Sequence, residues 1–244
     1  MPLPLNFKPK KKFELIRIGK NNDGGYLCGL NSVRMSKNLI SLGVFDDISF
    51  EKNFRKLNNN CKINFYDKYV DNVFWLKILW KNLGLSIFKL NPLFFLRSLF
   101  KYVDFYNFVK KNKFYKKTID FNSINKILKK NKTFLKIDIE GSEYRALQEI
   151  IKHQKKIIAL VIEFHDVDLN LKKISNFIKK FKLTLTHIHP NNAGDLNYYK
   201  VPLILEMTFE KYPVSVNEEL IFPHEFDQNN AEEKPSINLV YKKF

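Results

Sequence analysis

The chain has 244 residues, and 45% of them are hydrophobic, which is enough to bury one large core and predicts a single domain over 1–244. The net charge of +17 would suit nucleic acid, an anionic membrane face or an acidic substrate. However, the lysines are scattered with Asn, Ile and Phe along the whole length, as expected from an AT-rich genome. We therefore do not expect nucleic acid as a partner.

The two cysteines, Cys28 and Cys61, give neither a disulfide framework nor the spacing of a zinc site. The basic N-terminus lacks the apolar segment of a signal peptide. The apolar stretch 73–109 is interrupted by lysines and an arginine, so no part of it reaches the roughly 18 apolar residues of a membrane span. We expect a cytoplasmic protein without a transmembrane segment, and a peripheral contact at the inner membrane face stays open.

An N-terminal hairpin segment is predicted within 1–30. A short strand over 15–18 and a second strand from Tyr26 flank a tight turn at Asp23, Gly24 and Gly25. Asp-Gly pairs are typical of hairpin turns. The turn also places an acid and a flexible backbone beside Tyr26, which we expect to be exposed.

The next segment has the order of a nucleoside-binding βαβ unit. A buried strand over 38–44 is followed by a helix from Phe50 with apolar residues at helical spacing, and a strand over 62–66 ends at Asp67. In such a unit, an acid at the position of Asp67 accepts hydrogen bonds from ribose hydroxyls.

The turn after the first of these strands has a single glycine, Gly43, and two acids, Asp46 and Asp47. A pyrophosphate cradle needs G-x-G-x-x-G, and carboxylates repel phosphate. Either acid can instead cap the following helix. The turn therefore favours a nucleoside ligand without phosphates and with a cationic centre.

Residues 72–113 change to an aromatic-rich helical pattern, with Asn91-Pro92 as the start of a second helix. We predict an inserted helical cap over the sheet edge. Packing in the core, a substrate lid and an interfacial membrane contact are three roles that stay open for it.

The rest of the chain predicts alternating strands and helices and then a C-terminal segment that wraps the surface. Strands are expected over 118–121, 133–139, 157–164, 183–188, 202–209 and 237–241, with a helix after each of the first three. The strands over 183–188 and 202–209 are predicted to be antiparallel or edge partners. This alternation indicates an α/β fold with a mostly parallel sheet.

The stretch 134–147 is the most informative one. Its apolar run is broken by Asp138, Glu140 and Gly141 before a helical pattern opens at Ser142, as at the end of a buried parallel strand facing a cleft. An ionised carboxylate there should face solvent or a partner, since burying it unpaired is costly. The alternative is that the two acids only cap the following helix.

Several of these pieces together resemble the FkbM-type branch of the class I S-adenosylmethionine-dependent methyltransferases. The resemblance covers about residues 14–210. It is carried by Arg17-x-Gly19, Asp23-Gly24-Gly25-Tyr26, Ser41-Leu42-Gly43-Val44, Asp47-Ile48-Ser49-Phe50-Glu51, Asp67 and, most specifically, Leu135-Lys136-Ile137-Asp138-Ile139-Glu140-Gly141-Ser142-Glu143. Phe45 departs from the pattern, because such turns commonly have a second small residue there.

The resemblance implies a Rossmann-like fold with about seven strands, mostly parallel, and an antiparallel hairpin at one edge. It also implies O-methylation of a sugar hydroxyl in a surface polysaccharide or its lipid-linked or nucleotide-linked precursor. The cofactor would be S-adenosylmethionine, held by Asp23, Gly24, Gly25, Tyr26, Ser41, Gly43, Asp47, Glu51, Asp67 and Asp138.

A sugar hydroxyl is a weak nucleophile, so a base or a metal ion is expected near the strand ends. Asp138 with Glu140, Glu163 with His165, and His187 with His189 are pairs that alternate by two and would share a side of a continuing strand. We expect catalytic roles for Asp138, Glu163, His165 and His189, which also allow a divalent metal site; a structural role stays open. Sugar contacts are expected from Tyr26, Glu140, His187, Asn191 and Asn192.

Two other functions stay open at this point. The charge allows an RNA methyltransferase, whose RNA binding would depend steeply on salt. A binding protein that kept the fold without catalysis is the other alternative.

Overall fold

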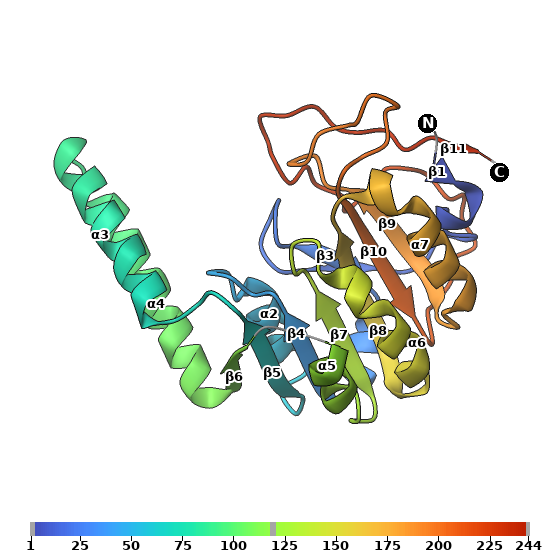
Figure 1. Ribbon diagram of the computed structural model, residues 1–244, viewed down its shortest axis with the longest axis horizontal. Helices are drawn as coiled ribbons and strands as arrows, with labels where there is room; N and C mark the ends of the chain where they lie inside the picture. The colour runs from blue at the N-terminus through green and yellow to red at the C-terminus, as the bar shows by residue number, and fades with distance from the viewer. Residues whose placement is uncertain (1–2, 118–120, 243–244) are drawn as a thin grey trace.

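The computed structural model of the protein describes residues 3–117 and 121–242. Seven strands form one central sheet in the order β6-β5-β4-β7-β8-β10-β9 (Figure 1). The first five of these are parallel, and β10 runs antiparallel to both β8 and β9. The predicted α/β fold with an antiparallel edge hairpin is thus confirmed. The strands are β4 (Asn38–Leu42), β5 (Lys62–Asp67), β6 (Lys113–Lys116), β7 (Thr133–Ile137), β8 (Ile157–Phe164), β9 (Thr184–Pro190) and β10 (Leu205–Glu210).

Helices cover both faces of this sheet, which is why β4, β7 and β8 are buried along their whole length. One core cluster joins the sheet to α5, α6 and α7 through Ile124, Ile150 and Phe177. The other joins it to α1 and α2 through Val33 and Phe54. The helices are α1 (Leu30–Met35), α2 (Ser49–Leu57), α5 (Phe121–Ile127), α6 (Leu147–His153) and α7 (Val167–Lys180).

The N-terminal segment contains the predicted hairpin, whose strands β2 (Ile16–Ile18) and β3 (Tyr26–Cys28) pair antiparallel. Before it come β1 (Leu3–Pro4) and a short 3-10 helix, η1 (Leu5–Phe7). The C-terminal strand β11 (Tyr241–Lys242) pairs with β1, so the two ends of the described chain lie side by side (Figure 1).

The helical insertion is present as α3 (Asn72–Phe88) and α4 (Leu93–Lys111). The prediction that it caps the sheet edge is wrong, because the two helices pack on each other and project from the body as an arm (Figure 1). Only the base of the arm enters the core, through Trp75 and Phe105. No helix in the described ranges is long and apolar enough to cross a membrane.

Other boundaries differ from the prediction. Residues 118–120 of the predicted strand over 118–121 lie outside the described residues, and Phe121 begins α5. The edge strand β6 was not predicted. Strand β7 ends at Ile137 and not at Ile139 as predicted, because the loops that carry Gly43 and Asp138 then come into contact. Two 3-10 helices flank α6: η2 (Glu143–Arg145) precedes it and η3 (Gln154–Lys156) follows it.

Candidate active site

A cavity of about 460 Å³ opens at the carboxyl edge of the sheet, above the ends of β4, β5 and β7. This is the edge at which open α/β sheets bind ligands. Its wall contains both acidic and basic side chains, and the apolar part includes Val44, Phe50 and Ile139. The charged residues of the wall are Asp23, Asp46, Asp47, Asp67, Asp138, Glu140, Lys20, Lys68, Lys117, Lys136 and Arg145.

The glycine turn forms the floor of this cavity. Gly43 has φ +77°, and a Cβ there would lie 1.5 Å from the carbonyl oxygen of Asp138. No side chain other than hydrogen fits this approach of the two loops. Lys136, buried in β7, donates a hydrogen bond of 3.0 Å from Nζ to the Gly43 carbonyl.

Asp67 holds the turn from the side. Its Oδ2 accepts hydrogen bonds from the backbone N–H groups of Val44 (3.1 Å) and Phe45 (2.8 Å). Its Oδ1 accepts from those of Tyr69 (2.7 Å) and Val70 (3.1 Å). A carboxylate has about four acceptor positions, so Asp67 is fully used by backbone donors. These bonds also stabilise Phe45, which has a left-handed φ of +47°.

Asp47 belongs to the same turn and lies beside the hairpin loop. Its Oδ1 accepts a hydrogen bond of 2.9 Å from the Ser49 N–H at the start of α2, but the N-cap residue of this helix is Ile48, so the predicted cap by Asp46 or Asp47 is wrong. Its Oδ2 lies 3.0 Å from Lys20 Nζ, which also lines the cavity. The hairpin turn at Asp23 and Gly24 forms the adjacent wall.

Ser41 and Glu51 lie beneath the turn and not in the cavity wall. Both are fully buried, and the Ser41 hydroxyl donates a hydrogen bond to Glu51. Burial raises the pKa of Glu51, and the charge of Lys136 opposes this rise. The structure therefore places these two predicted cofactor residues outside the cavity wall.

Tyr26 is buried and not exposed as predicted, because its ring packs edge-on against Phe50 under the hairpin. Its hydroxyl lies 3.1 Å from Asp138 Oδ2 and 3.3 Å from Glu163 Oε2. It thus links the carboxylate that follows β7 to the carboxylate near the end of β8.

His165 lies among three carboxylates. Its Nδ1 is 3.1 Å from Glu143 Oε1, and its Nε2 is 3.3 Å from Glu163 Oε1 and 3.4 Å from Glu140 Oε2. Burial lowers the pKa of His165, but the hydrogen bonds to Glu143 and Glu163 outweigh it and raise the value to about 11. His165 is therefore a cation at neutral pH.

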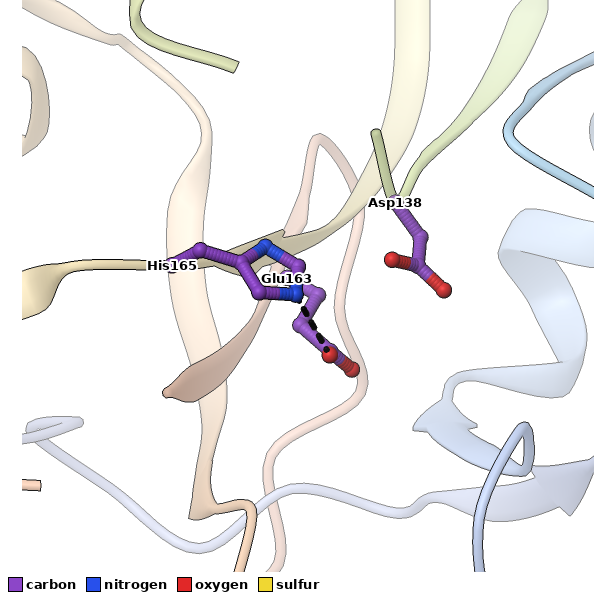
Figure 2. Close-up of side chains that lie close together, drawn as sticks. All are labelled: Asp138, Glu163 and His165. Atoms are coloured by element: carbon purple, nitrogen blue, oxygen red, sulfur yellow. Dashed lines mark ion pairs between the residues drawn. The ribbon is translucent and has the colours of Figure 1, made fainter. Parts of the chain in front are cut away.

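Figure 2 shows Asp138, Glu163 and His165 gathered at the ends of two neighbouring strands. One ligand atom from each of the three lies within 4.8 Å of the other two, so the three side chains are close enough to share a metal ion. Burial raises the pKa of Glu163, while its hydrogen bond to His165 lowers it. A protonated His165 would place a positive charge beside the carboxylates of this cluster.

His187 and His189 share a side of β9, as predicted, but they face the C-terminal segment and not the cavity. His187 Nε2 lies 2.9 Å from Asp227 Oδ1, and His189 Nε2 lies 3.1 Å from Asn230 Oδ1. Asn230 also donates a hydrogen bond of 2.8 Å to Glu206. Burial raises the pKa of Glu206 to about 8.

The two predicted asparagines differ in role. Asn192 holds the C-terminal segment, since its side chain donates to the Ala231 carbonyl (2.9 Å) and accepts from the Ala231 N–H (2.9 Å). Asn191 lies closer to the catalytic candidates, with Nδ2 3.4 Å from Glu163 Oε1.

Sequence reasoning missed one charged residue of the cavity wall and two of the neighbouring histidine cluster. Lys136 and Glu206 carried a signal, because a charged residue inside an otherwise apolar strand must have a partner. Asp227 carried none, since nothing local in the polar tail distinguishes it from its neighbours.

A family model described as the methyltransferase FkbM domain matches residues 12–182. No curated protein matches the chain.

Solved structures similar to this chain include a precorrin-6Y C5,15-methyltransferase from Geobacter metallireducens, at 13% identity and a TM-score of 0.41, covering 75% of this chain and 85% of that one. The fibrillarin pre-rRNA processing protein from Methanococcus jannaschii has 8% identity and a TM-score of 0.40, covering 81% and 82%. An rRNA methylase from Streptococcus thermophilus has 10% identity and a TM-score of 0.39, covering 74% and 93%.

Proposed function

The chain belongs to the FkbM methyltransferase family, and on this premise we propose that it methylates a sugar hydroxyl of a surface polysaccharide or its precursor. That it is an S-adenosylmethionine-dependent methyltransferase follows from the family. The acceptor is the proposed part. The observation that carries it is the position of Asp138 at the cavity wall, beside a cluster of groups that fix its hydrogen bonds.

The residues present fit S-adenosylmethionine, because the cavity has a single-glycine floor and acids where a phosphate cradle would need backbone donors. The Gly43 turn, Asp47 and the hairpin residues Asp23 and Gly24 would hold it, and Lys20, which pairs with Asp47, is the proposed partner of its carboxylate. When bound, it supplies an electrophilic methyl group. Asp67 contributes by fixing the turn, which is our proposal for this residue in place of direct ribose binding.

Asp138 is the proposed base that accepts the proton of the acceptor hydroxyl. It is partly exposed to the cavity, while Tyr26 fixes one of its carboxylate oxygens. Positioning an acceptor oxygen in line with a methyl group can supply about 7 to 11 kcal/mol of the barrier, so a fixed base suffices for the rest.

Glu163 and His165 act through Asp138 in this proposal. The cation of His165 orients Glu163 and opposes the rise of its pKa that burial causes, and Glu163 in turn lies against the Tyr26 hydroxyl. Of the predicted sugar contacts, Glu140 lines the cavity and is proposed to bind an acceptor hydroxyl. Asn191 positions Glu163, whereas His187, His189 and Asn192 fix the C-terminal segment.

A divalent ion is the second proposal for the cluster of Asp138, Glu163 and His165. The donor set fits Mn²⁺ or Zn²⁺, but the ion would have to displace the proton held by His165. It would supply Lewis acidity toward the acceptor oxygen. Metal binding at this cluster would therefore strengthen as the pH rises.

We place the reaction in the cytoplasm, and the two cysteines support this setting. Cys28 and Cys61 are both free and buried. Burial raises the pKa of each thiol, which keeps both protonated and unreactive.

The test is methyl transfer from S-adenosylmethionine with a labelled methyl group. Three acceptor pools are compared: nucleotide sugars, lipid-linked saccharides and total RNA. Label in a sugar O-methyl group, identified by mass spectrometry, supports the proposal. Label in RNA alone overturns it, and failure to bind S-adenosylmethionine in calorimetry would favour a non-catalytic binding protein.

A further inference from the structure

The arm formed by α3 and α4 exposes an unusual amount of apolar surface. Trp80, halfway along α3, is 70% exposed, and at the tip Phe88 is 84% and Leu90 91% exposed. Contiguous apolar patches of this kind on a soluble surface mark sites of interaction. The other large hydrophobic residues exposed on the arm are Val73, Leu76, Ile87, Leu93, Leu96, Phe100, Val103 and Tyr106.

The apolar residues of α3 surround the helix and do not form one stripe. Only one side of α3 can pack on α4, so the remaining sides face outward along a helix of about 25 Å. The charges between these residues are of one sign. Over 72–111 the arm carries Lys77, Lys81, Lys89, Arg97, Lys101, Lys110 and Lys111 against the single acid Asp104.

The positive charge is most one-sided in the distal part of the arm. Between Lys77 and Arg97 it has four cations and no acid. Lys101 and Asp104, nearer the base, already form ion pairs with Asp46 and Lys52 of the body. The tip therefore combines apolar side chains with unpaired positive charge.

We propose that the arm binds the surface of an anionic phospholipid bilayer, with its tip residues among the lipid chains and its lysines at the headgroups. Basic residues near an anionic leaflet gain from its surface potential, and long lysine stems reach from an apolar depth to the headgroups. A tryptophan such as Trp80 prefers this interface. A second copy of the arm is a poorer occupant, because it would bring like charges together.

The base of the arm adjoins the cavity, so this binding would hold the cavity near the lipid. Lys68 and Tyr69, which lead into α3, line the cavity wall. Phe74, in the first turn of α3, packs edge-on against Phe45 of the glycine turn at 5.0 Å. The whole arm is about as long as α3, so the cavity would lie within roughly 25 Å of the bilayer.

The experiment is vesicle sedimentation with the full chain. Vesicles of phosphatidylcholine are compared with vesicles containing about one third phosphatidylglycerol, at low and high salt. We expect binding to the anionic vesicles that weakens with salt. A blue shift of tryptophan fluorescence should accompany binding and disappear in Trp80→Phe.

The tip variant Phe88→Ser/Leu90→Ser should bind the anionic vesicles at least about tenfold more weakly, because it loses the apolar anchor. The matched control is Leu169→Ser/Tyr198→Ser, which removes two side chains of similar exposure (80% and 93%) from the body. It should bind as the unaltered protein does, and thermal unfolding checks that both variants fold.

Three results would overturn the proposal. One is absence of binding to anionic vesicles at low salt, and another is equal binding by the tip variant. The third is a dimer in light scattering that the tip variant abolishes, together with no vesicle binding, which would assign the arm to a second copy of the chain. None of these results depends on which acceptor is methylated.

Discussion

The Nδ1 atom of His165 lies 3.1 Å from Oε1 of Glu143, a carboxylate that is completely buried. The same carboxylate oxygen accepts hydrogen bonds from the backbone N–H groups of Ile139 and Gly141, each at 3.1 Å. The loop that carries Asp138 is therefore fixed to the end of β8 by one histidine and one glutamate.

The first prediction concerns pH. The pKa of His165 is raised from 6.5 to about 11, so its protonated form stabilises the folded state fully below pH 6.5. That contribution is lost as the pH rises toward 11. The free energy of unfolding, measured by urea denaturation, should therefore fall between pH 7 and 10. In His165→Gln this fall should be smaller, and the variant should be less stable by about 3 kcal/mol at pH 7.

Glu206 also loses its proton in this range, since its pKa is about 8. For this reason the test compares how the free energy of unfolding changes with pH in the unaltered protein and in His165→Gln. The change in either protein alone is not sufficient. Identical pH dependence in the unaltered protein and in His165→Gln would show that His165 is not held as a cation.

The second prediction concerns the glycine turn. Gly43→Ala would place its Cβ 1.5 Å from the Asp138 carbonyl oxygen at a φ of +77°, so we expect loss of more than about 3 kcal/mol in stability. The control is Gly84→Ala in α3, where a Cβ meets nothing within 4 Å. It should gain about 1 kcal/mol from helix propensity. Thermal unfolding of the two variants measures both effects, and a stable Gly43→Ala protein would mean that the two loops lie apart.

The third prediction separates two roles of Asp67. If Asp67 holds the turn, Asp67→Asn should lower stability by about 2 kcal/mol and also weaken S-adenosylmethionine binding, because an amide N–H₂ would face backbone donors. Direct contact with ribose alone would weaken binding while leaving stability unchanged. Calorimetry and urea denaturation of the same variant distinguish the two. Asp67→Ala should abolish binding in either case.

The fourth prediction concerns the base. Asp138→Asn should retain the fold and bind S-adenosylmethionine within a few fold, but lose methyl transfer by about 100-fold or more. Glu140→Gln is the comparison, since the Glu140 side chain is 81% exposed at the same loop, and it should chiefly raise the KM of the acceptor. Single-turnover transfer at saturating acceptor measures the first effect. Full activity in Asp138→Asn would show that another residue is the base.

The fifth prediction concerns a metal ion. If the imidazolium of His165 supplies the charge at the cluster, treatment with a chelator should leave methyl transfer unchanged. Restoration of lost activity by Mn²⁺, and not by Mg²⁺, would instead support a metal bound by Asp138, Glu163 and His165. Glu163→Gln should abolish that restoration.

The elements that the sequence predicted best are those whose signal is local. Strand β8 was predicted to the residue, because IIALVIEF is apolar on both faces and is bounded by polar segments. The hairpin turn at Asp23 and Gly24 was predicted because an Asp-Gly dipeptide is typical of such turns. The gathering of Asp138 with Glu163 and His165 was also predicted, since the ends of neighbouring parallel strands meet at one edge.

The parts that were missed depend on contacts distant in the chain. His187 faces Asp227, forty residues away, and no periodicity of either segment indicates that pairing. The four backbone donors around Asp67 could not be predicted from the sequence, because they reach its carboxylate only once two loops have folded. The exposure of α3 was missed because an apolar helical pattern predicts burial, whether or not another element of the chain packs on the helix.

Strand β6 leaves one edge of the seven-stranded sheet without a neighbour in the part of the chain that the structure describes. An open edge is a template for pairing with another chain, and lysines on such a strand oppose that pairing. Both ends of β6 are lysines, Lys113 and Lys116, and both are exposed. The basic character of the chain thus has a physical consequence that is independent of any ligand, because it protects this edge from aggregation.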